Sequence, residues 1–142
     1  MQNGVMIAFL PTSGEWCKQP LPHLTLAYAG TIEDISLTSF NDLAKDALTV
    51  ARQTGPLMLK VLGIEVFGDE EKVDVLRLEE TPQLLAAREL VEHWNVSEYD
   101  FAPHCTIGPE GSAEGYIPTR LFFQELIVTW GHRELRFRLG DY

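Results

Sequence analysis

The stretch PHLTLAYAG, residues 22–30, carries a pattern that returns as PHCTIGPEG at residues 103–111. In both copies a histidine directly follows a proline, and a threonine stands two positions after the histidine. Residues i and i+2 of a β-strand point to one face of a sheet, while the residues between them point to the other face. Each copy therefore predicts a strand that presents one imidazole and one hydroxyl on the same face.

The residues that alternate with these polar side chains are apolar in both copies. They are Leu24 and Leu26 in the first copy, and Cys105 and Ile107 in the second. Their positions predict that they face the core. Each preceding proline fixes its own φ angle and lacks an N–H group, which suits the start or the edge of a strand.

Further strands and two helices are predicted on either side of these motifs. Apolar residues at helical spacing favour a helix over residues 36–54. Thr81 as N-cap and Pro82 at the first helical position mark a second helix, with Leu84, Ala87, Val91 and Trp94 as its buried stripe. The other predicted strands are residues 4–11, a hairpin of residues 56–68 and 73–80, and two strands within residues 121–142 that join near Gly131. The order β-β-α-β-β-α-β-β-β predicts one α+β domain over residues 1–142.

Composition narrows the range of functions. The 142 residues include 11 Lys and Arg against 21 Asp and Glu, so the formal net charge is -10. An extended RNA or DNA surface needs many basic residues, and therefore we expect no long nucleic-acid footprint. No apolar run approaches the roughly 20 residues of a membrane helix, and no membrane association is expected. Two cysteines without a C-x-x-C pair point to a reducing, cytoplasmic setting.

Two His-x-Thr strands placed side by side would form a phosphodiester-cleaving site. Near neutral pH one of His23 and His104 can be a neutral base while the other is a cationic acid. General acid–base help of this kind is worth about 10²–10⁴-fold for each group. The hydroxyls of Thr25 and Thr106 would bind the phosphate oxygens as charge develops. This chemistry needs neither a metal nor another cofactor.

The tetrads HLTL at residues 23–26 and HCTI at residues 104–107 resemble the paired H-x-[ST]-h motifs of the 2H phosphoesterase superfamily, in which h is a hydrophobic residue. That family includes 2′–5′ RNA ligase-like enzymes and cyclic phosphodiesterases. The resemblance implies a bilobal fold, with two antiparallel β-sheets flanking a central groove and helices on the outside. It also implies that His23 and His104 are catalytic and that Thr25 and Thr106 bind phosphate.

One departure from the family bears on the substrate. Many RNA-directed members carry a basic residue soon after the second motif, whereas this chain continues with Gly108, Pro109 and Glu110. Together with the acidic net charge, this favours a small nucleotide or short oligonucleotide as the partner. Candidate substrates are a 2′,3′-cyclic phosphate, a cyclic oligonucleotide or a 2′–5′-linked oligonucleotide. The protein itself is expected to be a monomer.

Five further residues are candidate substrate contacts, each with a plainer alternative. Tyr28 and Tyr116 could stack a nucleobase, or pack in the core or at the rim. Trp130, His132 and Arg133 could form a wall of the groove, in which Trp130 stacks a base and Arg133 pairs with a phosphate. The alternative for His132 is an exposed turn between two strands.

Two other functions stay open at this stage. The same cleft could bind and sequester a cyclic nucleotide or a phosphorylated ligand without cleaving it. The protein could also be structural, with two histidines satisfied in separate parts of the core. The sequence also leaves open which histidine is the base and which the acid.

Overall fold

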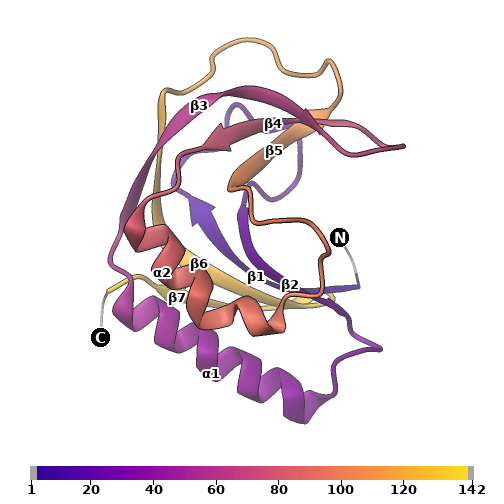
Figure 1. Cartoon of the computed structure of the whole chain (residues 1–142), viewed down its shortest axis with the longest axis vertical. Helices are drawn as coiled ribbons and strands as arrows, with labels where there is room; N and C mark the ends of the chain where they lie inside the picture. The colour runs from indigo at the N-terminus through magenta and orange to yellow at the C-terminus, as the bar shows by residue number, and fades with distance from the viewer. Residues whose placement is uncertain (1–2, 141–142) are drawn as a thin grey trace.

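The computed structural model describes residues 3–140, and its elements follow the predicted order (Figure 1). The strands are β1 (Gly4–Pro11), β2 (Leu24–Thr31), β3 (Leu57–Phe67), β4 (Val73–Leu78), β5 (His104–Pro109), β6 (Arg120–Trp130) and β7 (Arg133–Arg138). The helices are α1 (Leu37–Gln53) and α2 (Pro82–Val91), followed by a short 3₁₀ turn, η1 (Glu92–Trp94). The α+β class is therefore confirmed. Trp94 lies in this 3₁₀ turn and not in the second helix, where it was predicted.

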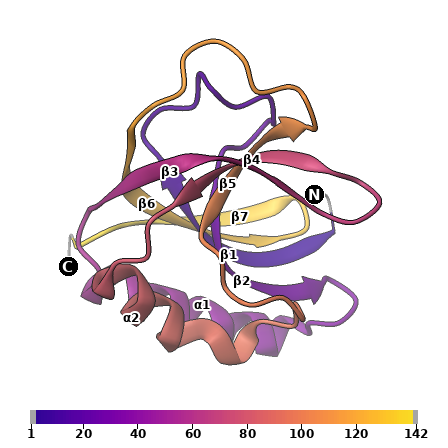
Figure 2. The ribbon, with the colours of Figure 1, turned by 45° about the horizontal axis from the view of Figure 1, so that its top comes forward.

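All strand pairs are antiparallel and belong to one seven-stranded sheet in the order β1-β2-β5-β4-β3-β6-β7. A further pairing of β1 with β6 closes the sheet on itself, and β7 adds to β6 (Figure 2). The two predicted sheets are thus two halves of one sheet. One half contains β1, β2, β6 and β7, and the other contains β3, β4 and β5. They are continuous because β2 pairs with β5 and β3 pairs with β6.

Each helix begins after a capping residue. Thr81 is the cap that was predicted for the second helix, and Ser36, predicted as the first residue of the first helix, is its cap. The Ser36 hydroxyl accepts a hydrogen bond from the Ser39 N–H at 3.1 Å, and the Thr81 hydroxyl accepts one from the Leu84 N–H at 3.1 Å. Each cap satisfies an N–H group that has no partner within its helix. The residue after α1, Thr54, donates its own N–H to the Val50 carbonyl and ends the helix.

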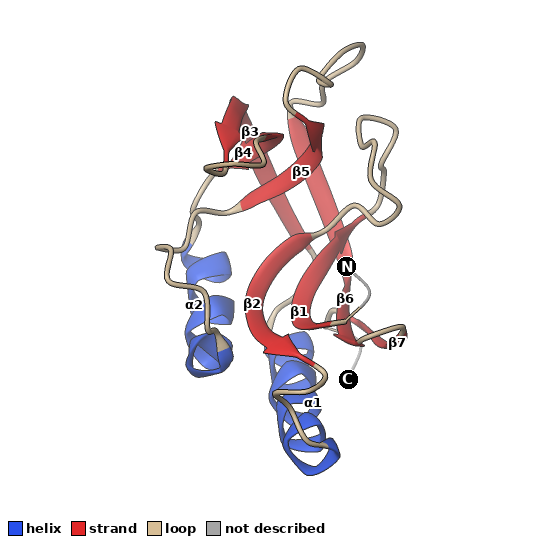
Figure 3. Cartoon of the chain, turned by 90° about the vertical axis from the view of Figure 1, so that its right-hand side faces the viewer, coloured by secondary structure: helices blue, strands red, loops and turns tan. Residues whose placement is uncertain are grey.

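Both helices pack beside the half of the sheet that contains β1, β2 and β6 (Figure 3). Helix α1 contacts β6, β7 and α2, and α2 contacts β2. The two halves of the molecule therefore differ, because both helices lie next to each other beside the same half. No helix within residues 3–140 has both the length and the apolar character needed to cross a membrane.

The core lies between this half of the sheet and the helices, and it extends under the site motifs. Leu24, Leu26, Cys105 and Ile107 are all fully buried in it. The predicted alternation is thus confirmed for both motifs. Burial of these four side chains holds both site strands to the core by the hydrophobic effect.

Candidate active site

The two motifs meet where β2 and β5 pair. Leu24 lies opposite Cys105 in this antiparallel pairing, and both side chains are fully buried. The residues on either side of such a pair point to the opposite face of the sheet. His23 and Thr25 therefore share that face with His104 and Thr106, and all four are half-buried. The predicted juxtaposition of two imidazoles and two hydroxyls is what this register produces.

Both imidazoles are held in the same way. The Nδ1 atom of His23 lies 2.7 Å from the Leu21 carbonyl oxygen, and Nδ1 of His104 lies 2.7 Å from the Ala102 carbonyl oxygen. A carbonyl oxygen only accepts hydrogen bonds, so Nδ1 carries the hydrogen in each ring. Each neutral imidazole therefore keeps an unprotonated Nε2 that can take a proton. In both motifs the accepting carbonyl belongs to the residue before the proline.

The surroundings favour the neutral form of both histidines. Burial lowers the pKa of His23 and of His104 below the ordinary value of 6.5, because the charged ring loses solvation. The hydrogen bond to Leu21 or Ala102 opposes this effect in each case. The positive charges of Arg77 and of His23 lower the pKa of His104 further. The two rings therefore lie close enough for the charge of His23 to lower the pKa of His104.

A pocket of about 680 Å³ lies beside His104 of the second motif. Thr25 and His104 are part of its wall, and the ring of Phe67 meets the His104 ring edge-on at 4.7 Å between centroids. Its aromatic and acidic lining residues are Tyr28, Phe67, Tyr99, Phe101, Asp69 and Asp100. Such a mixture of aromatic faces and a few polar groups is typical of small-molecule sites.

Of the five predicted substrate contacts, the pocket wall includes Tyr28. Tyr116 is 77% exposed in the loop between β5 and β6, outside that wall. Trp130 packs on Phe40 of α1 at 5.9 Å between ring centroids, so it serves the helix–sheet contact. His132 and Arg133 are exposed at the β6–β7 turn. The structure therefore does not bring Tyr116, Trp130, His132 and Arg133 to the pocket.

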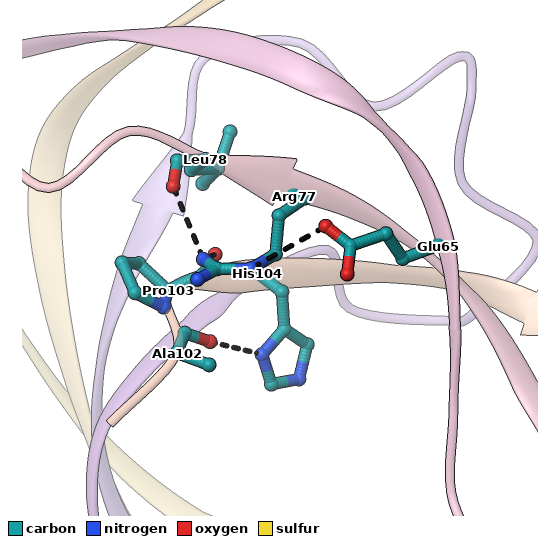
Figure 4. Close-up of polar contacts among 6 residues, drawn as sticks. All are labelled: Glu65, Arg77, Leu78, Ala102, Pro103 and His104. Atoms are coloured by element: carbon teal, nitrogen blue, oxygen red, sulfur yellow. Dashed lines mark hydrogen bonds and ion pairs between the residues drawn. The ribbon is translucent and has the colours of Figure 1, made fainter. Parts of the chain in front are cut away.

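Three residues near the site were not identified from the sequence. Arg88 of α2 lines the pocket, donates to the Leu26 carbonyl and lies over the Phe101 ring, 4.8 Å from its centroid. Asn95 also lines the pocket and accepts a hydrogen bond from the Tyr28 N–H at 3.0 Å. Arg77 of β4 lies opposite His104 (Figure 4). None of them belongs to a local motif, and only the strand and helix packing brings them here.

The residues needed for a metal site do not gather within residues 3–140. No group of three or more His, Cys, Asp or Glu side chains in that range has the arrangement to hold a metal ion.

Comparison with known sequences places these observations in a family context. The sequence model described as the 2′-5′ RNA ligase superfamily matches residues 15–125 of the chain. A protein of Bacillus mycoides (strain KBAB4) named "putative phosphoesterase" is 30% identical over 92 residues, which are 63% of this chain and 52% of that protein. The match thus spans about half the length of that relative.

Solved structures share the fold over nearly the whole chain. LigT of E. coli, in a crystal structure with 3′-AMP, has a TM-score of 0.63 and 18% identity, and the match covers 98% of this chain and 99% of LigT. TT0787 of Thermus thermophilus has a TM-score of 0.64 and 18% identity, with 98% of this chain and 100% of that chain covered. At this level of identity the likeness concerns the fold.

Proposed function

This chain belongs to the 2′-5′ RNA ligase superfamily, and we propose that it is a phosphodiesterase that hydrolyses a small nucleotide phosphodiester with His23 and His104 as its acid–base pair. The observation that carries the proposal is the Leu24–Cys105 pairing, which turns one imidazole and one hydroxyl of each motif to the same face. The phosphoesterase name of the Bacillus relative agrees with this activity.

The proposed reaction uses the Nε2 atoms of both histidines. One neutral imidazole takes a proton from water as the water oxygen forms a bond to phosphorus. The other imidazole, in its cationic form, gives a proton to the ribose oxygen as the phosphorus–oxygen bond breaks. Thr25 and Thr106 donate hydrogen bonds to the non-bridging oxygens, where negative charge grows. After turnover the two histidines have exchanged protonation states, and solvent restores them.

The proposed substrate is a nucleotide that has its phosphodiester between the histidines and its nucleoside in the pocket. Aromatic rings of the pocket, including Tyr28 and Phe101, offer stacking surfaces for a base. The carboxylates of Asp69 and Asp100 lie at the same pocket and repel further phosphates. LigT, which shares the fold, was crystallised with the nucleotide 3′-AMP. These features favour a 2′,3′-cyclic phosphate or a short cyclic or 2′–5′-linked oligonucleotide over a long RNA.

Turnover of defined substrates tests this proposal. We would compare a nucleoside 2′,3′-cyclic phosphate, cyclic di- and trinucleotides and a 2′–5′-linked dinucleotide, each with and without EDTA, and assign the products by phosphorus NMR. We expect hydrolysis of at least one of these substrates at a rate that EDTA does not change. Strong inhibition by EDTA, or a preference for long RNA, would contradict the proposed mechanism or substrate. Tight binding without any product would indicate a protein that sequesters nucleotides.

A further inference from the structure

Arg77 makes several polar contacts beside the second motif (Figure 4). Its Nη1 atom donates to the Pro103 carbonyl at 2.8 Å and to the Leu78 carbonyl at 3.2 Å. Its Nε atom lies 3.5 Å from Oε2 of Glu65 on β3. The side chain is 20% exposed, so these contacts are shielded in part from water. Charge-assisted hydrogen bonds of this kind are stronger than those between neutral groups.

These contacts act on the backbone that carries His104. The Pro103 carbonyl belongs to the peptide bond that leads into His104, and it also accepts from the Leu78 N–H at 2.9 Å. The carbonyl one residue earlier, on Ala102, holds the His104 ring. Two successive carbonyls therefore fix the main chain and the imidazole of this residue. A displaced Pro103 would displace the His104 ring as well.

The first motif does not have the same support from its neighbouring strand. Phe9 of β1 is the partner of Leu24, and the next residue of β1 is the apolar Leu10. On the other side of the site, Arg77 of β4 is the direct partner of His104. The two copies of the motif therefore have different neighbours, which are apolar for the first copy and include a charged arginine for the second.

We propose that Arg77 is a positioning residue for the second motif, which clamps the Pro103–His104 backbone from β4 and sets a permanent positive charge beside the His104 imidazole. This role presupposes the phosphodiesterase proposed above for its effect on catalysis, whereas its effect on the imidazole can be measured without any substrate. An arginine suits this task because its guanidinium stays charged at all physiological pH values.

The charge of Arg77 also affects the protonation state of His104. A permanent cation opposes protonation of His104, in addition to the burial that lowers the pKa of both histidines. The neutral form of His104 is therefore favoured, and its Nε2 atom can take a proton.

Other charged groups near His104 bear on its titration and come from several elements. They are Glu65 on β3, Arg77 on β4, His23 before β2, Arg88 on α2, and Asp69 and Asp100 in the pocket loops. Two of these charges, those of Arg77 and His23, lower the pKa of His104. Of the two, Arg77 is the permanent cation. It is therefore the group to vary.

Titration of the four histidine rings by NMR tests the proposal directly. The His104 signal would be assigned with His104→Ala and followed against pH in the wild type, Arg77→Met and Arg77→Lys. We expect a higher His104 midpoint in Arg77→Met, because the cation is gone, and a midpoint close to wild type in Arg77→Lys. In turnover, Arg77→Lys should lower kcat by up to about 100-fold with a smaller change in KM, because the clamp on Pro103 is lost.

Glu65→Gln is the matched control, since it alters the ion pair but keeps the cation and both carbonyl contacts of Arg77. It should not raise the His104 midpoint. An unchanged midpoint in a folded Arg77→Met, or an unchanged kcat in Arg77→Lys, would overturn the proposal. If Arg77→Met does not fold, the kcat of Arg77→Lys decides whether Arg77 clamps the Pro103–His104 backbone. If no substrate is turned over, the proposed function fails while the titration still decides the role of Arg77.

Discussion

Leu24 and Cys105 lie opposite each other across β2 and β5, and both side chains are fully buried. This buried pair is the centre about which the two His-x-Thr motifs are arranged. Continued by one residue in each direction, the antiparallel register sets His23 opposite Thr106 and Thr25 opposite His104. Each half of the site therefore combines the histidine of one motif with the threonine of the other.

Removal of either imidazole should stop turnover. His23→Ala and His104→Ala should each lower kcat/KM by about 10²–10⁴-fold, because each removes one proton carrier. Their double variant should fall by much less than the product of the two effects, since the groups act as a unit. The measurement is steady-state turnover of the best cyclic or 2′–5′-linked substrate, with folding checked by circular dichroism.

The matched control for these variants is His93→Ala. His93 is an exposed histidine in η1, on the helix side of the molecule. Its Nε2 atom lies 3.2 Å from Oδ2 of Asp46. Its removal should leave turnover within about twofold of wild type. Equal losses in His93→Ala and His104→Ala would show that the assay reports folding and not proton transfer.

The two site histidines should also make stability depend on pH. Both have a pKa below the ordinary value of 6.5 in the folded protein, mainly because they are buried. As the pH falls through about 6.5, the unfolded chain binds protons that the folded protein resists. Their contribution to stability is therefore complete above that pH and is lost as the pH falls through the lower folded-state values. Urea unfolding at several pH values between about 5 and 8 measures this loss.

The comparison that isolates the histidines is the His23→Ala/His104→Ala double variant. Its stability should fall less than that of the wild type between about pH 7.5 and pH 5, because it lacks the two groups that resist protonation. Identical losses in both proteins would mean that other groups, such as the many carboxylates, account for the pH dependence.

Removal of charge at the pocket should relax the preference for small substrates. Asp69 and Asp100 are exposed at the pocket, and Asp69 accepts a hydrogen bond from the Tyr99 hydroxyl at 3.2 Å. The Asp69→Asn/Asp100→Asn variant keeps acceptor oxygens but loses two negative charges. We expect KM for an oligonucleotide with additional phosphates to fall by up to about fivefold, the effect of an exposed charge pair, and the gain to fade at high salt.

KM for a mononucleotide 2′,3′-cyclic phosphate is the internal reference for that variant and should change less. Glu114→Gln, which removes an exposed charge outside the pocket wall, is the matched control. An equal effect of Glu114→Gln would assign the change to net charge and not to the pocket.

Asp74 should be important for stability although it is not a site residue. It is 6% exposed, and its Oδ2 atom accepts from the Gly111 N–H at 3.0 Å and from the Ala113 N–H at 3.1 Å. These bonds anchor the loop after the second motif to β4. Asp74→Ala leaves both N–H groups without this partner and should cost about 1–3 kcal/mol of unfolding free energy. Asp74→Asn keeps one acceptor oxygen and should cost less.

Chemical unfolding in urea measures this effect, and Glu114→Ala in the same loop is the control. Glu114 is exposed, so its removal should change stability by less than about 0.5 kcal/mol. A loss in Asp74→Ala no larger than that in Glu114→Ala would show that the loop does not depend on this carboxylate.

Elements and faces could be predicted from the sequence because they depend on local patterns. Alternation in HLTL and HCTI determined which side chains face the core, and Ser36 and Thr81 marked the starts of the helices. The two predicted hairpins, β3 with β4 and β6 with β7, are present. Pairings between distant segments, such as β1 with β6, and their register were not predictable from local patterns. The continuous sheet in place of two separate sheets is one consequence.

Arg77 illustrates the same limit at the site. Its guanidinium contacts the Pro103 carbonyl, 26 positions away, only because β4 pairs with β5 in one particular register. Trp130 and Arg133 show the reverse case, in which residue types suited to nucleotide binding lie elsewhere. Trp130 lies against Phe40, and Arg133 lies at the β6–β7 turn, since β6 runs away from the paired motifs towards α1.

The position of β1 between β2 and β6 also affects how the chain reaches this structure during synthesis. The Met6 N–H donates to the Thr129 hydroxyl, 123 positions further along the chain. A ribosome therefore releases β1 long before β6 exists, and one edge of an apolar strand stays unpaired in the meantime. Contacts of such high sequence separation slow folding, because a long loop must close before they form. The sheet can therefore close only after β6 has been synthesised.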